Sequence, residues 1–431
     1  MPDTPGHSLI RRAPSVPTSR FCSCCGLTLA ELRQQSRVGC AACYDAFADL
    51  LAQSIERLHD ATEHPNGSAS TSLLRSYVGD RRPFESASLE VDRLHWLCGE
   101  GEAVDVILSS RVRLARNLAD ADFPGRADEA SRQRTRERVL ESLALVCPHW
   151  GVLPAEAYDT HLFHLLRERH LLSYSANPRK DSRALVSSFG AAFSAEINEE
   201  DHLRLQSLQP GLALGHAHAE LEQLAASLDQ RLGFAHSSKR GYLTACPSNL
   251  GSGLRASVLL HLPALAQLEA LPEVARKVTR AGGLTLRGPH GETSALGSPF
   301  VQLSNQVTLG RSSAELVAQV EEVARSLADW ERLARNRLLT EQKARLEDAA
   351  WRAWGALSHA RLMESSECLE LLSQVRLGQL LHLLPTDPDP NQIARLLISM
   401  EAAHLQLFNP ATPDPEASRA DWLRSIFGRP A

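Results

Sequence analysis

Apolar residues recur along this chain in two patterns, short runs and longer stretches with helical spacing. Five short runs predict strands: Val104–Leu108, Ala184–Ser188, Ala191–Ile197, Tyr242–Ala245 and Arg255–Leu260. Helical spacing predicts helices over Ala46–Leu58, Glu129–Val146, Gly215–Leu232, Ala264–Ala281 and Ser313–Ala334. These elements do not alternate strictly, as they do in a doubly wound sheet. We therefore predict an α+β domain in which helices pack on an antiparallel sheet.

Changes in composition along the chain suggest its organisation into segments. Stretches rich in Gly, Pro and Ser occur before about residue 88. Beyond residue 335, apolar residues recur with helical spacing. We expect a disordered tail at 1–20, a cysteine-rich module at 21–60, a linker at 61–87, a densely patterned domain at 88–335, a helical domain at 336–408 and a Pro-rich, loosely ordered tail at 409–431.

Length and charge exclude some classes of protein. The 431 residues suffice for two or three domains, and 43% hydrophobic with 23% charged residues is typical of soluble globular proteins. A formal net charge of -5 argues against direct nucleic-acid binding. No run approaches the length of a membrane span, and the first 20 residues lack the apolar region of a secretory signal. We expect a cytoplasmic protein.

Five of the nine cysteines lie close together near the N-terminus. Cys22 and Cys25 form one C-x-x-C knuckle, and Cys40 and Cys43 form a second, 14 residues further on. Two such knuckles supply the four thiolates that a tetrahedral, structural Zn²⁺ requires, while Cys24 is left over. The four remaining cysteines are scattered, which suits a reducing compartment rather than a disulfide framework.

The cysteine-rich segment also resembles a known family. Phe21–Phe47 carries CxxCG-x-T and GCxxCY-x-x-F, as does the second zinc knuckle of the McsA family, activators of a protein arginine kinase. The first knuckle pair and the helical hairpin of that family are absent here. The resemblance therefore implies that activation works only in cis.

Arginines and acids then recur in four motifs. Ser109–Asn117 (SSRVRLARN) places Arg111 and Arg113 on one face of a strand, where two guanidinium forks could bind phosphate oxygens. Taken alone, this motif would be a solvated basic strand, and Asn198–Arg204 (NEEDHLR) a solvated acidic turn. Its acids could equally serve as a base, as partners of a guanidinium or near a metal.

Two glycine loops complete the set. They are Cys246–Arg255 (CPSNLGSGLR) and Arg287–Glu292 (RGPHGE), and neither has the Lys or the spacing of a Walker loop. Together the four motifs bring five arginines (111, 113, 204, 255 and 287) and several carboxylates to strand ends or loops. That combination is typical of phosphoryl transfer, where catalysis is mostly positioning and charge neutralisation.

In this order the four motifs resemble the phosphagen (guanidino) kinase catalytic domain, over about residues 90–335. The resemblance implies that the five arginines hold the phosphates of ATP with a bridging Mg²⁺. It implies that Glu200 and Glu292 bind and orient the acceptor guanidinium and that one removes its proton, with Glu199 as the alternative to Glu200. The clamp is needed because a free guanidinium, with a pKa above about 12, is a poor nucleophile.

Further positions follow from the same resemblance. Cys246 matches the family's reactive cysteine, with Asn249 also near the substrate, and His170 lies either near the nucleotide or simply on a surface helix. The ATP-binding set that it implies is Ser109, Ser110, Arg111, Val112, Arg113, His170, Arg204, Arg255, Ala256, Ser257, Val258, Leu259, Arg287, Gly288, Pro289, His290 and Gly291.

Kinases of free creatine or arginine carry a helical domain before the first motif, with a loop that closes over the small substrate. Here that region holds the cysteine module and a linker, so we expect an open acceptor pocket, as an arginine on a protein requires. Leu346–Ala353 and Leu372–Gly378 resemble the C-terminal domain of the McsB-type protein arginine kinase, which binds phosphoarginine through paired arginines. Arg352 could be one of such a pair, although Ala349 stands where a second basic group is expected; a plain helical packing domain is the alternative.

The sequence therefore predicts an ATP-dependent protein arginine kinase, with an activator-like zinc module fused to it. The family role implied is stress response and protein quality control, marking proteins for a Clp-type AAA+ protease with action on a stress repressor. Two alternatives stay open: a free-arginine phosphagen kinase, and a non-catalytic adaptor that binds phosphoarginine or a Clp ATPase. A homodimer is compatible with the sequence.

Overall fold

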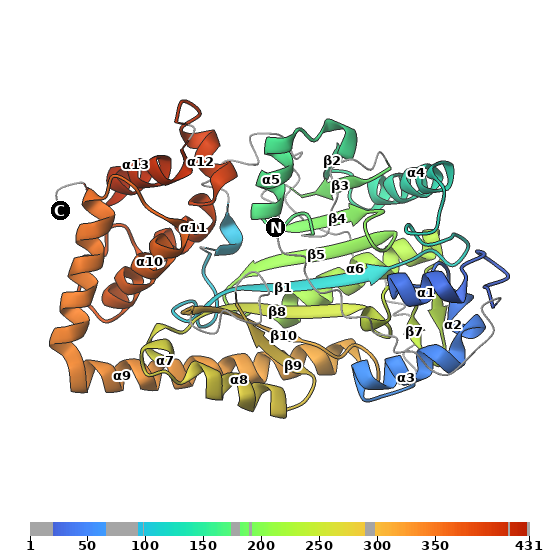
Figure 1. Ribbon diagram of the computed structural model, residues 1–431, viewed down its shortest axis with the longest axis horizontal. Helices are drawn as coiled ribbons and strands as arrows, with labels where there is room; N and C mark the ends of the chain where they lie inside the picture. Colours follow the sequence, from blue (N-terminus) through green and yellow to red (C-terminus); the bar gives the residue numbers. More distant parts are fainter. Residues whose placement is uncertain are drawn as a thin grey trace.

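A single antiparallel sheet organises the molecule. The computed structural model describes residues 20–65, 94–97, 99–173, 182–188, 192–288, 298–412 and 414–428. In this part of the chain eight strands form one sheet in the order β2-β3-β4-β5-β1-β8-β10-β9 (Figure 1). The strands are β1 (Ile107–Arg116), β2 (Gly151–Pro154), β3 (Ala184–Ser187), β4 (Phe193–Ile197), β5 (Leu203–Pro210), β8 (Leu254–His261), β9 (Leu284–Arg287) and β10 (Phe300–Asn305). A separate small hairpin pairs β6 (His236–Ser237) with β7 (Gly241–Tyr242).

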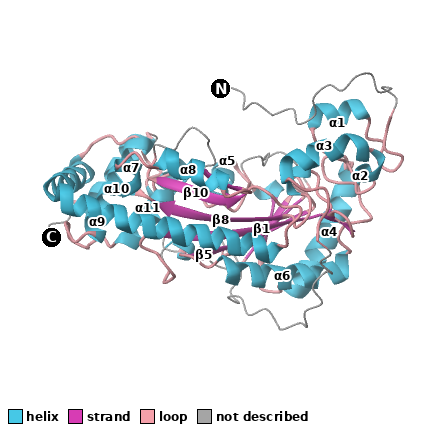
Figure 2. Cartoon of the chain, turned by 90° about the horizontal axis from the view of Figure 1, so that it is seen from below, coloured by secondary structure: helices cyan, strands magenta, loops and turns pink. Residues whose placement is uncertain are grey.

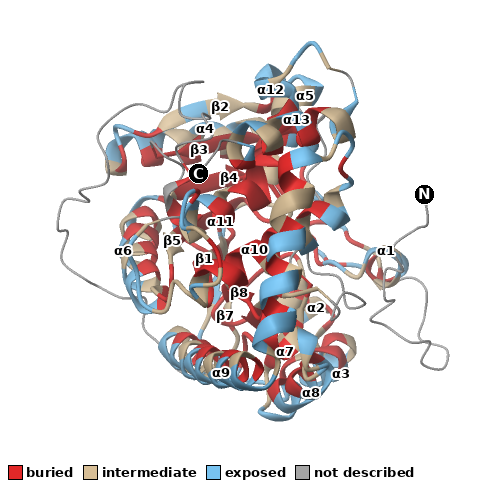
Figure 3. Ribbon diagram, turned by 90° about the vertical axis from the view of Figure 1, so that its left-hand side faces the viewer, coloured by how far each residue is buried: buried red, intermediate tan, exposed pale blue. Residues whose placement is uncertain are grey.

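Strand alternation gives the sheet an apolar face and a polar face. On β1 and β8, residues such as Val112, Leu114, Ala256 and Val258 are fully buried. They pack against α6 (Leu214–Leu232) and α9 (Ser313–His359), and α4 (Glu129–Val146) packs in turn on α6. Figure 2 shows α6 and α9 together on one side of the sheet, and Figure 3 shows that much of β4 and β8 is buried. The other face of the central strands carries the polar side chains.

Local sequence signals explain where the main helices begin and end. Asp128 caps α4 by accepting the backbone N–H of Ser131, and Ser312 with Glu315 forms a capping box at the start of α9. α6 ends at Gly233, which adopts a left-handed conformation (φ 65°) that suits glycine. α9 is 47 residues long and is kinked at Gln342.

The two ends of the sheet carry different appendages (Figure 1). At the end where β1 terminates lies a small module of α1 (Leu29–Gln35), α2 (Cys43–Ala46) and α3 (Ala48–His59). At the other end lies a helical region formed by the last part of α9 with α10 (Ser365–Leu380), α11 (Pro390–Ser399), α12 (Ala402–Phe408) and α13 (Pro415–Phe427). The remaining helices are α5 (Thr160–Glu168), α7 (Pro263–Gln267) and α8 (Leu271–Arg280), with short 3-10 turns at His95–Leu97, Ala155–Ala157 and Pro247–Asn249.

The predicted class, an antiparallel sheet flanked by helices, is confirmed, but some elements differ. The first strand begins at Ile107 and runs through the arginine motif, so the predicted Val104–Leu108 strand was misplaced. The predicted Ala264–Ala281 helix is broken into α7 and α8, because the chain turns at Leu268–Ala270. The expected tail from residue 409 contains α13, whose Leu423 and Phe427 are buried. An apolar face within a Pro-rich context was the signal for this helix.

Among the described residues, none of the helices combines the length and the hydropathy that crossing a bilayer needs. The expected linker falls mostly on residues 66–93, and the expected N-terminal tail on residues 1–19; both lie outside the described residues.

Candidate active site

The register of the sheet collects five arginines on its polar face. Arg113 of β1 lies directly opposite Arg255 of β8, and Arg204 of β5 lies opposite Ala115, two residues further along β1. Arg111 shares the face of Arg113 because side chains alternate along a strand. Arg287 of β9 lies on the same face, because it pairs with Gln302 of β10, which in turn pairs with Leu259 of β8.

Four of these side chains, Arg111, Arg113, Arg204 and Arg255, line an open cavity of about 330 Å³, whereas Arg287 is not part of its lining. The cavity is lined by Arg111, Arg113, Ala115, His170, Glu199, Glu200, Asp201, Arg204, Ser248, Asn249, Gly253, Arg255 and Gln302. Arg111 is oriented by Gln206, whose Oε1 accepts from Arg111 Nη2 at 2.8 Å, and by the carbonyl of His170 at 3.2 Å. Arg255 donates to Ser304 Oγ at 3.0 Å. The forks are therefore held in place before any ligand arrives.

Crowding of like charges makes this cavity a site for an anion. Burial, and then the charges of Arg111, Arg204 and Arg255, lower the pKa of Arg113 well below its usual value. Burial and the charges of Arg287 and Arg204 lower the pKa of Arg255 to about 10. A guanidinium keeps its proton in proteins, so the repulsion between these arginines is relieved by binding negative charge rather than by deprotonation. A polyphosphate supplies that charge in a form that matches the forks bidentately.

The acidic motif turns at Asn198, and its residues divide between two roles. Asn198 has φ 55°, and its side-chain amide donates to the carbonyls of Arg132 and Ser182. This turn brings Glu199 and Glu200 to the cavity. Glu199 is buried, with its Oε2 3.8 Å from Nη1 of Arg204, whereas the side chain of Glu200 is 22% exposed.

The next two residues of the motif build the site's frame. Asp201 Oδ1 accepts from Asn117 Nδ2 at 2.5 Å and from the backbone N–H of Ala245 at 2.7 Å. Burial, and then the charge of Glu200, raise the pKa of Asp201 to about 7. His202 is fully buried, with Nδ1 accepting from Leu118 N–H and Nε2 facing the carbonyl of Asp122; burial lowers its pKa to about 4. Asp201 thus ties the acidic turn to the loop between β7 and β8 (residues 243–253, called the cysteine loop because it carries Cys246), and His202 is a neutral structural residue.

The cysteine loop closes one side of the cavity. Cys246 lies beside Ser248, with Sγ and Oγ 3.0 Å apart, and its pKa is raised by burial and then by Glu200. Ser248 and Asn249 line the cavity. The glycines after them are required for close packing: a Cβ on Gly253, at φ 60°, would approach the carbonyl oxygen of Ala115 to 2.7 Å. The backbone therefore sits directly against β1 at the site.

An apolar hollow continues the cavity toward the C-terminal helices. It has a volume of about 60 Å³ and shares Arg111, His170 and Gln302 with the arginine-lined cavity. Its apolar walls are Trp96, Leu208, Leu259, Phe300, Leu369, Leu397 and Ile398. Leu369, Leu397 and Ile398 belong to α10 and α11, so the helical region forms one wall. A flat, largely apolar group such as a nucleotide base fits next to phosphates bound by the arginines.

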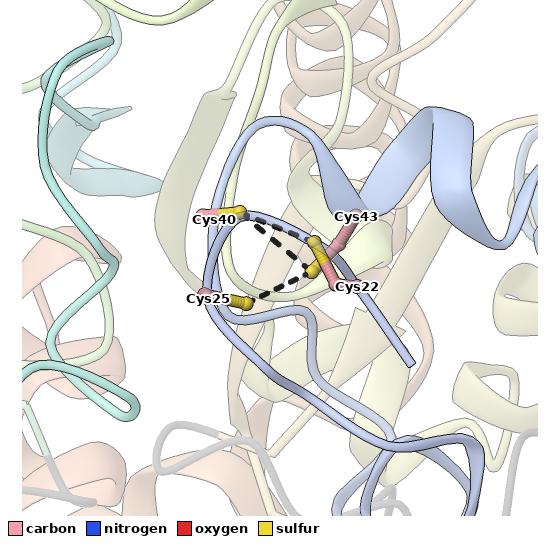
Figure 4. Close-up of side chains that lie close together, drawn as sticks. All are labelled: Cys22, Cys25, Cys40 and Cys43. Atoms are coloured by element: carbon pink, nitrogen blue, oxygen red, sulfur yellow. Dashed lines mark hydrogen bonds between the residues drawn. The ribbon is translucent and has the colours of Figure 1, made fainter. Parts of the chain in front are cut away.

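The four knuckle cysteines converge in the N-terminal module (Figure 4). The Sγ–Sγ distances are 3.8 Å for Cys22–Cys40, 3.5 Å for Cys25–Cys43 and 3.9 Å for Cys40–Cys43. Four thiolates about 2.3 Å from one Zn²⁺ lie about 3.8 Å from each other, so the arrangement fits a tetrahedral zinc site. All four are buried, whereas Cys24 is exposed, which explains why it is the extra cysteine.

This zinc module (residues 20–65) packs directly on the cysteine loop. Val38 N–H donates to the carbonyl of Ala245 at 3.0 Å, and the Tyr44 hydroxyl donates to that of Thr244 at 2.8 Å. His59 Nε2 lies 2.8 Å from the carbonyl oxygen of Pro247. Buried apolar residues of the module also share one cluster with Ala245 and other residues of the sheet domain, such as Leu243 and Leu250. The module therefore touches the loop on both sides of Cys246.

Not every predicted residue reaches the cavity. Arg111, Arg113, His170, Arg204 and Arg255 line it, as do Glu199, Glu200 and Asn249, while Ser109, Ser257 and Leu259 line the apolar hollow. The predicted ATP-binding set also includes Ser110, Val112, Ala256 and Val258, because they lie within the same motifs. Strand alternation sends their side chains to the opposite face, where all four are buried. Gly288 ends the described part of its loop; Pro289, His290, Gly291 and Glu292 lie outside the described residues.

Some residues of the site were missed by sequence reasoning. Gln206 follows Arg204 by two residues, so alternation along the strand could have identified it. Gln302 and Ser248 carry no such signal. Glu196, opposite Arg204 in the sheet, is buried and accepts from Ser173 N–H; its pKa is raised to about 7 by burial. Arg352 lies away from the cavity on α9, 79% exposed and 3.9 Å from Asp348.

Comparison with known proteins agrees with this geometry. Residues 151–334 match the ATP:guanido phosphotransferase C-terminal catalytic domain, residues 343–430 the protein-arginine kinase McsB C-terminal domain, and residues 20–65 the McsA central zinc-finger domain. Among solved structures, the duplicated taurocyamine kinase from Schistosoma mansoni is 26% identical with a TM-score of 0.55, covering 69% of this chain and 40% of its own. Lombricine kinase has a TM-score of 0.56 at 23% identity, covering 72% of this chain and 86% of its own, which supports the fold alone.

Fold and site together define the class as the ATP:guanido phosphotransferases, of which the arginine-lined cavity is the centre. Within it, curated protein-arginine kinases from Halothermothrix orenii and Symbiobacterium thermophilum are 39% and 40% identical to this chain. Each alignment covers 72% of this chain and 89% of the relative. The chain belongs to the protein-arginine kinase family.

Proposed function

We propose that this chain is an ATP-dependent kinase that transfers the γ-phosphoryl group to arginine side chains of proteins. The observation that carries the proposal is one cavity in which a cluster of guanidiniums faces two carboxylates, Glu199 and Glu200. The relatives that share this architecture are protein-arginine kinases, which favours a protein-borne arginine over the free amino acid.

The charges along the cavity suggest how transfer proceeds. Arg111, Arg113 and Arg255 hold the phosphates of ATP and neutralise charge that develops on the leaving ADP. Glu200 binds the acceptor guanidinium and aligns a terminal nitrogen with the γ-phosphorus. As the N–P bond forms and the bond to the β-phosphate oxygen breaks, the nitrogen's proton passes to a carboxylate. Glu200 is the first candidate for this base, with Glu199 and Glu292 as alternatives.

Mg²⁺ and Zn²⁺ have separate places in this proposal. Magnesium binds through substrate phosphates and one or two carboxylates, and the carboxylate oxygens at the rim of the cavity suit it. When bound, it would add charge neutralisation on the phosphates. Zinc, held by the four buried thiolates, stabilises the module that packs on the cysteine loop.

The cellular role follows from the family rather than from the geometry. We infer that phosphoarginine made by this chain marks proteins for a Clp-type AAA+ protease, and that a stress repressor is one target. This role places the protein in the cytoplasm. Phosphoarginine sensing through Arg352 and formation of a homodimer both stay predictions. The exposed position of Arg352 adds no support to the sensing role.

The test is transfer itself. The purified chain is incubated with Mg-ATP and an unstructured protein such as casein, with free arginine in a parallel tube. Mass spectrometry under non-acidic conditions then locates phosphate on arginine. Phosphoarginine on casein with little on free arginine is the expected result. Transfer to free arginine alone would contradict the proposed substrate class, and absence of transfer in both tubes would contradict the kinase assignment.

A further inference from the structure

One cation at the acceptor side of the site comes from outside the kinase core. Arg37 lies between α1 and Cys40 in the zinc module, and its Nε donates to Oε1 of Glu200 at 3.0 Å. The pKa of Arg37 is raised, first by the charge of Glu200 and further by Cys246 and Glu199. The carboxylate expected to receive the acceptor guanidinium thus already holds a guanidinium of the same chain.

The surroundings of Arg37 place it across Glu200 from the phosphate-binding arginines. Glu199 and Glu200 line the arginine-lined cavity and also a second cleft of about 230 Å³ between the zinc module and the kinase core. Arg37 lines this second cleft, with Gln35 and Val38 beside it, but is not part of the lining of the first. An acceptor arginine entering from the zinc side would therefore meet Arg37 at Glu200.

The backbone around Arg37 is fixed. Ser36 before it has φ 53°, and Val38 after it is hydrogen-bonded to Ala245. The next residue, Gly39, accepts from the N–H of Phe123 at 2.8 Å. With both neighbours anchored, Arg37 reaches Glu200 through its Nε edge without extending into the arginine-lined cavity. This geometry suits occupation of the carboxylate and does not suit transfer to the terminal nitrogens of Arg37.

We propose that Arg37 is a tethered competitor for the acceptor site, which a substrate arginine must displace from Glu200 before transfer. This inference rests on the proposed function, since it assigns Glu200 to the acceptor guanidinium. A tethered group acts at a high effective concentration, so an acceptor arginine that binds weakly does not displace Arg37 from Glu200. The zinc module then regulates the acceptor affinity of the site it covers.

The expected size of the effect follows from exposure. The side chain of Arg37 is 51% exposed and that of Glu200 is 22% exposed, so water and salt screen the pair. Such ion pairs change an equilibrium constant by a factor of about two to five. Removing the charge of Arg37 should lower the acceptor KM by about this factor, with kcat and the KM for ATP unchanged. The difference from the wild type should shrink as salt is raised.

The experiment compares Arg37→Gln and Arg37→Lys with the wild-type full chain, using an arginine-containing peptide as the acceptor. Zinc content and melting temperature verify that each variant is folded. The matched control is Arg240→Gln, which removes a module-to-core ion pair with Asp45 (2.7 Å) away from Glu200. The expected result is a lower acceptor KM for Arg37→Gln, an intermediate value for Arg37→Lys and no change for Arg240→Gln.

Other results would overturn the inference. A higher acceptor KM or a lower kcat in Arg37→Gln would show that Arg37 positions Glu200. An equal shift in Arg240→Gln would show that looser docking is the cause, and phosphate found on Arg37 itself would make this residue an acceptor. Peptide transfer with an unchanged KM in Arg37→Gln would defeat this inference alone, whereas no transfer by wild type or variants would defeat the proposed function.

Discussion

The zinc module and the C-terminal helical region hold the same sheet at opposite ends, by different kinds of contact. The zinc module bonds to the backbone of a loop, through the carbonyls of the buried residues Thr244, Ala245 and Pro247. The helical region instead inserts Arg376, which is 1% exposed, into the core of the sheet's other end. Its guanidinium donates to the carbonyls of Val104 at 2.8 Å and Asp105 at 3.0 Å, and lies 2.7 Å from Nδ1 of His261.

In the proposed function, this difference separates the two substrates of the reaction. The loop that the zinc module contacts carries Cys246 and faces Glu200, on the acceptor side. The helical region walls the apolar hollow that extends from the arginines, on the side suited to a nucleotide base. A change at the zinc end should therefore alter the handling of the acceptor, and a change at the helical end the binding of ATP. Loops adjust easily and buried guanidiniums do not, so the acceptor end is the adjustable one.

The largest effect is expected from Glu200→Gln, which removes the acceptor carboxylate but leaves the arginines in place. Transfer should fall by at least about 100-fold, the usual contribution of a positioned base, with ATP affinity within about twofold of wild type. Activity assays and nucleotide titration by calorimetry check both values. Glu273→Gln, an exposed glutamate on α8, is the matched control. A parallel loss of ATP affinity would break the division between the two ends.

Zinc removal tests the same end through the module. Cys40→Ser, or chelation, should undo the module and with it three hydrogen bonds to the cysteine loop, worth about 1 kcal/mol each. We expect kcat/KM for the acceptor to fall about tenfold or more, because losing the support of the loop outweighs the release of Glu200 from Arg37, while ATP affinity is retained. Metal analysis, kinetics and nucleotide titration measure the outcome. An equal loss for both substrates would mean that the module supports the whole core.

Arg376→Met tests the helical end. It leaves the carbonyls of Val104 and Asp105 without their donor, which should lower the free energy of unfolding by about 2–4 kcal/mol. The KM for ATP should rise by roughly threefold, equivalent to about 0.7 kcal/mol, because α10 and α11 form one wall of the apolar hollow. Urea unfolding and ATP titration provide the readouts, and the exposed Arg352→Met is the control. An effect confined to the acceptor KM would reverse the comparison.

The smallest effect concerns pH and Asp201. Its pKa in the folded chain is raised to about 7, from an ordinary value near 3.8, so folding favours the protonated form. Its stabilising contribution is complete below about pH 4 and is lost as the pH rises toward 7. Between pH 5.5 and 8 the wild type should lose roughly 2 kcal/mol more than Asp201→Asn, which keeps an oxygen acceptor for Ala245 N–H. Urea unfolding at the two pH values measures this, and equal slopes would show an unshifted carboxyl.

Sequence reasoning succeeded where chemistry and periodicity coincide. The arginines could be identified because several lie in motifs on strands, where alternation alone places Arg111 and Arg113 together. The zinc cysteines could be identified because ligand spacing fixes a metal site locally. The same motifs also include Val112 and Ala256, whose side chains are buried on the opposite face, since a motif is contiguous whereas a strand presents alternate residues to each face.

The rest depended on long-range contacts. Nothing in Ser36-Arg37-Val38 distinguishes Arg37 from other exposed arginines, and its pairing with Glu200 spans 163 residues. The wall formed by Leu397 and Ile398 likewise arises only when α11 joins the apolar cluster that includes Leu208 of β5 and Phe300 of β10. Sequence patterns specify local elements, while such pairings follow from how the elements assemble.

Helix α9, which runs from the sheet into the helical region with a kink at Gln342, limits how the chain can change length. Its first part packs on the sheet and its last part forms the core of the helical region, so the boundary expected at residues 335–336 falls inside one helix. Each residue inserted there would rotate everything downstream by about 100° and advance it by about 1.5 Å. One added codon would therefore swing Arg376 away from Val104 and Asp105. Over this stretch the helix tolerates substitutions but not insertions or deletions, because its length sets the orientation of the helical region relative to the sheet.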